Sequence, residues 1–147
     1  MKIAYLDTSV LLRILLNEKF KQIEIANYDK LISSELIEIE ARRRINNMRL
    51  SGQVNEGEMI ALGTRLELAL ESIDLIKLTR VILLRAKQTV GIQIRTLDYL
   101  HLCSALLWKE TRGQDFAVLT HDIEFGRAAQ VLGFETVGVV AEYFGPW

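Results

Sequence analysis

The stretch that decides the fold lies at residues 2–16 and reads KIAYLDTSVLLRILL. Residues 2–6 form a short apolar run with one aromatic side chain, which is typical of a buried β-strand. Asp7, Thr8 and Ser9 then offer side-chain oxygens that cap a helix, and the apolar residues from 10 to 16 continue as that helix. The stretch therefore predicts a strand that passes directly into a helix, with an aspartate at the junction.

The rest of the chain repeats this alternation of short apolar runs and amphipathic segments. Further strands are predicted at residues 31–32, 73–78, 116–119 and 135–140. Helices are predicted from a Ser33-Ser34 cap to Ser51-Gly52, at 55–70, at 79–90, from a Thr96 cap to Gly113, and at 122–132. Strands that alternate with helices predict an α/β fold with a mostly parallel sheet covered on both faces. With 147 residues, no repeat and no long linker, we expect residues 1–147 to form a single domain.

Composition sets limits on the class of protein. The net charge is −1, from 18 basic and 19 acidic residues, and this balance neither requires nor excludes a nucleic-acid partner. Cys103 is the single cysteine, so no internal disulfide can form, and its apolar surroundings predict buried packing. No apolar run approaches the roughly 20 residues that span a bilayer, and the first residues lack the pattern of a signal peptide. We therefore expect a soluble, cytoplasmic protein with no membrane partner.

Four carboxylates stand out by position: Asp7, Glu40, Asp98 and Asp122. Asp7 and Asp122 follow predicted strands, where sites form in open α/β sheets. Glu40 and Asp98 lie in amphipathic helical segments. If the fold gathers them, two like charges about 4 Å apart repel by roughly 4 kcal/mol at an effective dielectric constant near 20. A hard divalent cation such as Mg²⁺ would neutralise this charge, which points to metal-assisted phosphodiester chemistry.

Each acid also has an ordinary structural interpretation. Asp7 and Asp122 are suited to cap the helices that follow them. Glu40 could pair on a helix surface with the arginines three and four positions further on. Asp98 stands near the start of its helix, where a carboxylate complements the helix dipole. The pattern around the four acids therefore carries more information than any one of them.

That pattern resembles the PIN-domain family of metal-dependent ribonucleases. LDTSVL at 6–11 looks like the opening strand and first aspartate of the family, and SSELIEIEARR at 33–43 is similar to its second motif. RTLDYLHL at 95–102 resembles the third motif, and LTHD at 119–122 the fourth. In this register the family acids fall on Asp7, Glu40, Asp98 and Asp122. Residues 51–93 carry no family motif.

The size and the expected compact single-domain form look most like the VapC-type toxins of bacterial and archaeal toxin–antitoxin pairs. This resemblance implies a flavodoxin-like three-layer α/β/α sandwich with the acids in one cleft, dependence on Mg²⁺ or Mn²⁺, and cleavage of RNA. It also implies a homodimer and a cognate antitoxin protein that blocks the site. By this hypothesis Asp7 and Asp98 bind the metal directly. Asp122 and Glu40 bind through water, orient the nucleophile or complete a second metal site.

Hydroxyl and basic side chains near the acids are candidates for supporting roles. Thr8 or Ser9, together with Thr120, could hydrogen-bond the carboxylates and fix their rotamers, or could simply cap helices. Arg43 and Arg44 share the Glu40 side of the predicted helix and are candidates to bind an RNA phosphate.

Two nearby residues favour an ordinary role. For Arg42 we favour a solvated face with an ion pair to Glu38 or Glu40. His101 is interpreted as a packing residue and not as a general base.

Three rival classes remain to be weighed. A haloacid-dehalogenase-type phosphotransferase usually has a second aspartate two positions after the first, and here Ser9 occupies that position. A dinucleotide-binding domain needs a glycine-rich turn after the first strand, and none is present near Asp7. The non-enzyme rival is a catalytically silent PIN-like scaffold that binds RNA or protein. Aromatic residues could serve a dimer or antitoxin surface or pack in the core: Trp108, Tyr143, Phe144 and Trp147.

Overall fold

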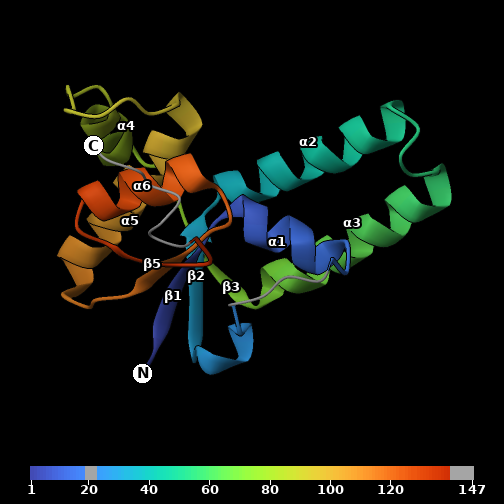
Figure 1. The fold of residues 1–147 in the computed structure, drawn as a ribbon, viewed down its shortest axis with the longest axis horizontal. Helices are drawn as coiled ribbons and strands as arrows, with labels where there is room; N and C mark the ends of the chain where they lie inside the picture. The colour runs from blue at the N-terminus through green and yellow to red at the C-terminus, as the bar shows by residue number, and fades with distance from the viewer. Residues whose placement is uncertain (19–22, 140–147) are drawn as a thin grey trace.

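The computed structural model describes residues 1–18 and 23–139, so Tyr143, Phe144 and Trp147 lie outside the described residues. Its centre is a sheet of five parallel strands in the order β3-β2-β1-β4-β5 (Figure 1). The strands are β1 (Ile3–Leu6), β2 (Lys30–Ser34), β3 (Ile73–Ile76), β4 (Ala117–Leu119) and β5 (Glu135–Val137). The predicted parallel sheet is confirmed, and every pairing in it is parallel.

Helices connect the strands and cover both faces of the sheet. They are α1 (Thr8–Leu15), α2 (Leu36–Leu50), α3 (Glu56–Glu71), α4 (Arg80–Ala86), α5 (Thr96–Arg112) and α6 (Ile123–Val131), with a short 3₁₀ turn η1 (Ile25–Asn27) before β2. The helices α1, α2 and α3 lie on one side of the sheet, and α4, α5 and α6 on the other (Figure 1). The result is the predicted three-layer α/β/α sandwich.

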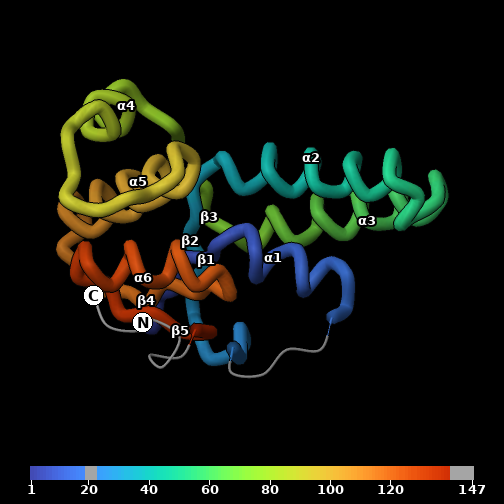
Figure 2. Tube along the Cα trace, turned by 45° about the horizontal axis from the view of Figure 1, so that its top comes forward, coloured from blue at the N-terminus to red at the C-terminus, as the bar shows by residue number. Residues whose placement is uncertain are grey.

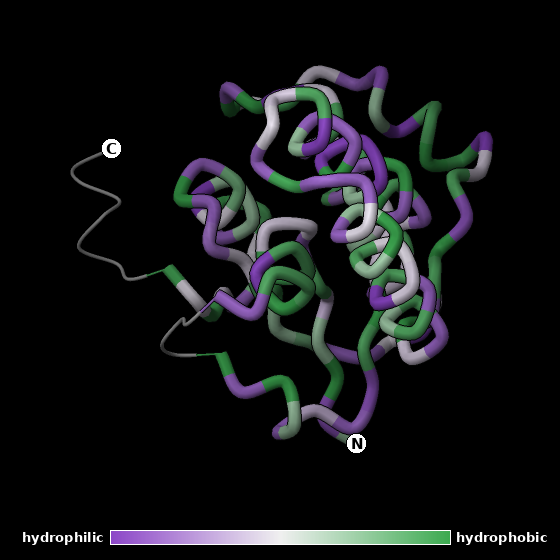
Figure 3. Tube along the Cα trace, turned by 90° about the vertical axis from the view of Figure 1, so that its right-hand side faces the viewer, coloured by the Kyte–Doolittle hydropathy of each residue, from purple (hydrophilic) through white to green (hydrophobic). Residues whose placement is uncertain are grey.

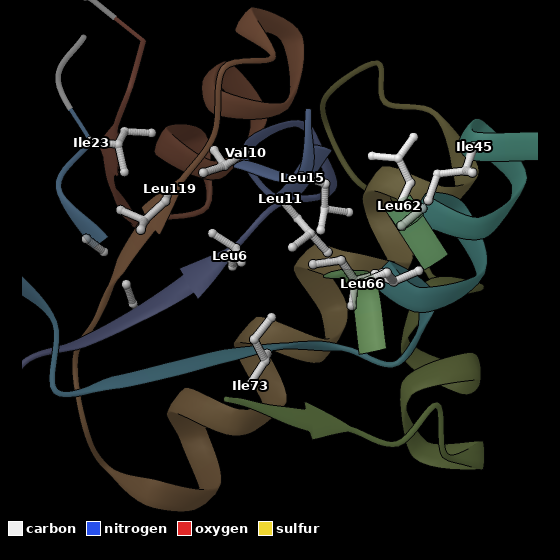
Figure 4. Packing of buried hydrophobic residues seen from close by; sticks show 14 residues of the cluster. Leu6, Val10, Leu11, Leu15, Ile23, Ile45, Leu62, Leu66, Ile73 and Leu119 are labelled. Carbon is white, nitrogen blue, oxygen red and sulfur yellow. The ribbon is translucent and has the colours of Figure 1, made fainter. Parts of the chain in front are cut away.

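Each face of the sheet has its own apolar core because side chains alternate along a strand. Ala4 and Leu6 of β1 pack with α1, α2 and α3, where Leu11 and Leu66 are fully buried (Figure 4). Ile3 and Tyr5 point to the opposite core, which α5 and α6 cover. Burial on both sides explains why residues 3–6 read as a continuous apolar run and do not alternate.

The helices α2 and α3 form an antiparallel pair that reaches beyond the sheet (Figure 2). Asn55 caps α3 because its Oδ1 accepts a hydrogen bond of 2.8 Å from the backbone N–H of Glu58. Hydrophobic and hydrophilic residues alternate along the helices when the chain is coloured by hydropathy (Figure 3), as expected for helices with one buried face. No helix of the described part of the chain is long and apolar enough to cross a membrane.

Several predicted boundaries are wrong by a few residues. Ser33 and Ser34 end strand β2, and Glu35 occupies the N-cap position of α2, although Ser34 Oγ still accepts a hydrogen bond of 3.2 Å from the backbone N–H of Leu36 at the helix start. The N-cap of α5 is Arg95, with Thr96 as the first helical residue. Predicted helix 79–90 ends at residue 86, and predicted strand 73–78 ends at residue 76. For β3 the end coincides with the end of its pairing with β2, at Ile76 opposite Ser34.

Two interpretations of single residues agree with the structure. Cys103 is buried, as predicted. Trp108 packs edge to face on Phe116 at a ring distance of 5.4 Å, which is the core alternative for this residue.

The strand order creates a switch point at β1. The chain first runs outward on one side, from β1 to β2 to β3, and then crosses over to place β4 on the other side of β1. All strands are parallel, so their carboxyl ends share one edge of the sheet. Asp7 follows β1 at that edge, and Thr120 and Asp122 follow β4 beside it. This is the position at which open α/β folds place their sites.

Candidate active site

A cavity of about 650 Å³ opens at the carboxyl edge of the sheet, and all four predicted acids line it. Asp7 comes from the end of β1, Glu40 from α2, Asp98 from the first turn of α5, and Asp122 from the N-cap of α6. The cavity is also lined by Thr8, Ser9, Leu12, Arg44, Arg95, Thr96 and Leu97. The fold therefore gathers acids that are up to 115 positions apart, since 122 − 7 = 115.

Asp7 is the most buried of the four acids, with 6% of its surface exposed. It occupies the N-cap position of α1, but its side chain makes no capping hydrogen bond. Instead its Oδ2 accepts hydrogen bonds from the hydroxyls of Ser9 at 2.6 Å and Thr120 at 2.8 Å. Burial raises the pKa of Asp7, and these two hydrogen bonds act in the opposite direction. The Asp7 carboxylate is therefore held by the two hydroxyls and not by capping of α1.

Thr120 also connects Asp7 to the start of α6. Its Oγ1 donates to Asp7 and accepts a hydrogen bond of 3.0 Å from the backbone N–H of Asp122. Ser9 Oγ donates to Asp7 and accepts a hydrogen bond of 3.0 Å from the backbone N–H of His121. Two hydroxyls thus tie the ends of β1 and β4 together, which fixes the Asp7 carboxylate relative to α6.

Glu40 is held by a chain of buried polar groups. Its Oε1 accepts a hydrogen bond of 3.1 Å from Thr8 Oγ1 and contacts His101 Nε2. The other ring nitrogen, Nδ1, lies 2.7 Å from Tyr5 Oη, which accepts a hydrogen bond of 3.0 Å from the backbone N–H of Ser34. The tautomer with the proton on Nε2 satisfies every member, because Tyr5 then donates to Nδ1 and His101 donates to Glu40.

Arg95 bridges the remaining two acids. Its Nε donates to Asp98 Oδ2 at 2.8 Å, and its Nη2 donates to Asp122 Oδ2 at 2.7 Å. Asp122 also uses its other oxygen, Oδ1, to cap α6 through the backbone N–H of Phe125 at 3.1 Å. Burial raises the pKa of Asp98, Arg95 lowers it, and the charges of Asp122 and Asp7 raise it. The charges of Asp7, Asp98 and Asp122 therefore repel one another across the cavity.

The three arginines after Glu40 differ in placement. Both Arg43 and Arg44 are exposed, but only Arg44 is part of the cavity lining. Arg42 pairs with Glu38 at 2.9 Å, one helical turn away, and lies 3.8 Å from Glu67 of α3. The ion pair agrees with the solvated-face interpretation of Arg42, and only the Arg44 position adjoins the acids.

The donor chemistry suits a hard cation, although the present side-chain arrangement is not a closed metal site. Carboxylate oxygens are the ligands that Mg²⁺ and Mn²⁺ prefer. Within residues 1–18 and 23–139, however, no group of three or more His, Cys, Asp or Glu side chains is close enough to hold a metal ion. The guanidinium of Arg95 occupies Asp98 and Asp122, so these two carboxylates would have to turn away from it to join Asp7 around one ion.

Sequence reasoning missed three contributors to this site: Arg95, His101 and Tyr5. Arg95 stands three positions before Asp98, a spacing that pairs opposite charges at a helix start, so it was detectable. Tyr5 carries a hydroxyl inside a buried strand, and such a hydroxyl needs a partner. His101 was assigned to packing. It is indeed buried, but it also contacts Glu40, and nothing local in the sequence indicated that contact.

Comparison with known proteins agrees with the motif analysis. The family model described as PIN domain matches residues 4–131, which includes all four acids and strands β1 to β4 but not β5. No curated protein matches the chain.

Proposed function

The chain belongs to the PIN domain family, and from this premise we propose that it is a divalent-metal-dependent endoribonuclease. PIN domains are generally nucleases. One observation carries the proposal for this chain, namely that four carboxylates from four separate elements line a single cavity at the carboxyl edge of the sheet. A binding scaffold has no need to carry the electrostatic cost of gathering them.

The four acids take different roles in this proposal. Asp7 and Asp98 hold the ion directly, and Asp122 contributes directly or through water. Glu40, held by Thr8 and His101, positions a water molecule for attack on the phosphorus. Ser9 and Thr120 keep the Asp7 carboxylate in place for the ion.

The cation and the basic side chains supply complementary charge. A bound Mg²⁺ or Mn²⁺ lowers the pKa of water and offsets charge on the phosphate in the transition state. Arg44, at the wall of the cavity, is the arginine placed to bind an RNA phosphate. Arg43 lies outside that wall and would contact only RNA that extends beyond the cavity.

We extend the proposal to the biological setting that the VapC resemblance implies. The chain is then one domain over residues 1–147, works in the cytoplasm as a homodimer, and is the toxin partner of an antitoxin protein. Expression of the wild-type chain in a bacterial host is expected to arrest growth, and expression of Asp7→Asn is not. Equal growth of the two strains at equal protein levels would contradict the toxin role and leave the nuclease role standing.

The proposal is tested by incubating the purified chain with labelled total RNA in Mg²⁺, in Mn²⁺ and in EDTA. We expect cleavage only with metal. Asp7→Asn and Glu40→Gln are expected to reduce cleavage by about a hundredfold or more, the usual size of effect for groups that act on the transition state. Glu38→Gln is the matched control, because Glu38 lies on the same helix but pairs with Arg42 away from the cavity.

The outcomes separate the candidate functions. Cleavage that persists in EDTA would remove the metal requirement. A folded chain that cleaves no RNA and binds no Mn²⁺ would instead favour the silent scaffold, with RNA or a protein as its partner.

A further inference from the structure

Arg95 lies between Asp98 and Asp122, where its positive charge offsets the repulsion between the two carboxylates. Its guanidinium contacts Asp98 and Asp122 through neighbouring nitrogens, so one positive group neutralises two of the four acids. The Arg95 side chain is 63% exposed, whereas that of Asp98 is 15% exposed. The arginine therefore covers the two acids from the solvent side and has room to move away.

The bonds of Asp122 determine which contact would yield to an ion. Both of its oxygens are engaged, Oδ1 by the N–H of Phe125 and Oδ2 by Arg95. Loss of the first bond would uncap α6, which generally costs more than the loss of an exposed ion pair. A cation that needs an oxygen of Asp122 would therefore displace Arg95 before it uncapped the helix.

We propose that Arg95 is an internal counter-ion that positions Asp98 and Asp122 and competes with a divalent cation for them. The inference rests on the metal requirement of the proposed function and adds a residue that sets metal affinity. Arg95 and the ion neutralise the same carboxylate charge, so each weakens the binding of the other. Arg95 also lines an adjoining cavity of about 520 Å³ with Gln93 and Glu124, which offers space for the displaced guanidinium.

The test compares Arg95→Gln with Arg44→Gln. Both variants remove one positive charge from the lining of the same cavity, but only Arg95 is ion-paired to the acids. Mn²⁺ binding is measured on the full chain by the electron paramagnetic resonance signal of free Mn²⁺. We expect Arg95→Gln to bind Mn²⁺ about three- to tenfold more tightly than Arg44→Gln. In EDTA we expect Arg95→Gln to melt at a lower temperature than Arg44→Gln, since Asp98 and Asp122 then repel without a counter-ion.

Arg95→Lys separates charge from geometry. An ammonium keeps the charge but lacks the planar fork that contacts two carboxylates, so its Mn²⁺ affinity should fall between those of wild type and Arg95→Gln. Equal or weaker Mn²⁺ binding by Arg95→Gln than by Arg44→Gln would overturn the inference, as would no binding by any variant. Because these readouts need no RNA, tighter binding by Arg95→Gln without any RNA cleavage would support the inference while the ribonuclease proposal fails.

Discussion

At the scale of single residues, Asp7 shows how a proposed metal ligand can reduce the stability of the fold. Its carboxylate is buried, and the hydroxyls of Ser9 and Thr120 only partly replace the water that it has lost. Its pKa in the folded protein therefore lies above the unfolded value of about 3.9. The stability from this group is fully present below the unfolded pKa and is lost as the pH rises through the folded pKa. Well above the unfolded pKa, burial of this carboxyl group is therefore a cost to the fold.

Asp7→Asn is therefore expected to stabilise the protein in EDTA while it abolishes cleavage. An amide oxygen can still accept the two hydroxyl hydrogen bonds, and an amide avoids the cost of keeping an acidic group buried above its unfolded pKa. We expect the free energy of unfolding to rise by about 1–2 kcal/mol at pH 7.5, which is the usual range for single stabilising substitutions. Near pH 4 the rise should be smaller. Urea unfolding at both pH values measures it. Asp115→Asn, at an aspartate whose side chain is 88% exposed, serves as the control and should change little. A destabilised Asp7→Asn would show that the charge is held favourably.

At the scale of elements, the start of α6 combines a helix cap and a proposed metal-binding role in one residue, Asp122. Asp122 caps the helix with Oδ1, as its position after a strand predicted, and directs Oδ2 to Arg95. The capping interpretation and the site interpretation of this aspartate are therefore compatible, because each uses a different oxygen. Asp7 differs, since its carboxylate caps nothing although it occupies an N-cap position.

Two substitutions at Asp122 separate these roles. Asp122→Asn keeps an oxygen for the N–H of Phe125, whereas Asp122→Ala removes the cap, so the alanine variant should be less stable than the asparagine variant by about 1 kcal/mol. Both should lose most RNA cleavage if Asp122 serves the metal. Thermal unfolding and the RNA assay give the two readouts. Asn55→Ala, which uncaps α3 far from the site, should lose similar stability and keep its cleavage rate. Full activity in Asp122→Asn would contradict a metal-binding role.

At the scale of the whole molecule, one polar chain joins four elements at the edge of the sheet. It runs from β2 through Tyr5 of β1 and His101 of α5 to Glu40 of α2, and so connects the two layers of helices. Tyr5 and His101 are almost completely buried. Each member is satisfied only when the others are in place, so the position of Glu40 depends on packing between distant segments.

Tyr5→Phe tests this connection with minimal change in shape. The substitution leaves the N–H of Ser34 and one nitrogen of His101 without their partner, which should cost about 1–3 kcal/mol in the free energy of unfolding. We also expect a lower kcat with little change in KM, because Glu40 loses its fixed orientation while the RNA-contacting surface is unchanged. Urea unfolding and steady-state cleavage measure the two effects. Tyr28→Phe is the control at a partly exposed tyrosine. An unchanged kcat would limit Tyr5 to a structural role.

The sequence by itself determined the layers of the fold and indicated the four acids that line one cavity. A continuous apolar run at residues 3–6 requires burial on both faces, and burial on both faces requires helices above and below a parallel sheet. Parallel strands bring their carboxyl ends to one edge, so Asp7 and Asp122 were predicted to meet there. Local patterns carried this information because they depend on periodicity and on strand ends, which are properties of short segments.

Only the tertiary structure decided which groups surround the acids. The contact of His101 with Glu40 spans 61 positions, that of Arg95 with Asp122 spans 27, and that of Thr120 with Asp7 spans 113. It also decided that Arg44, and not Arg43, adjoins the cavity, because the packing of α2 against the sheet sets which exposed arginine lies beside the acids. Such contacts depend on how helices pack and rotate against a sheet, and no short segment of the sequence specifies that geometry.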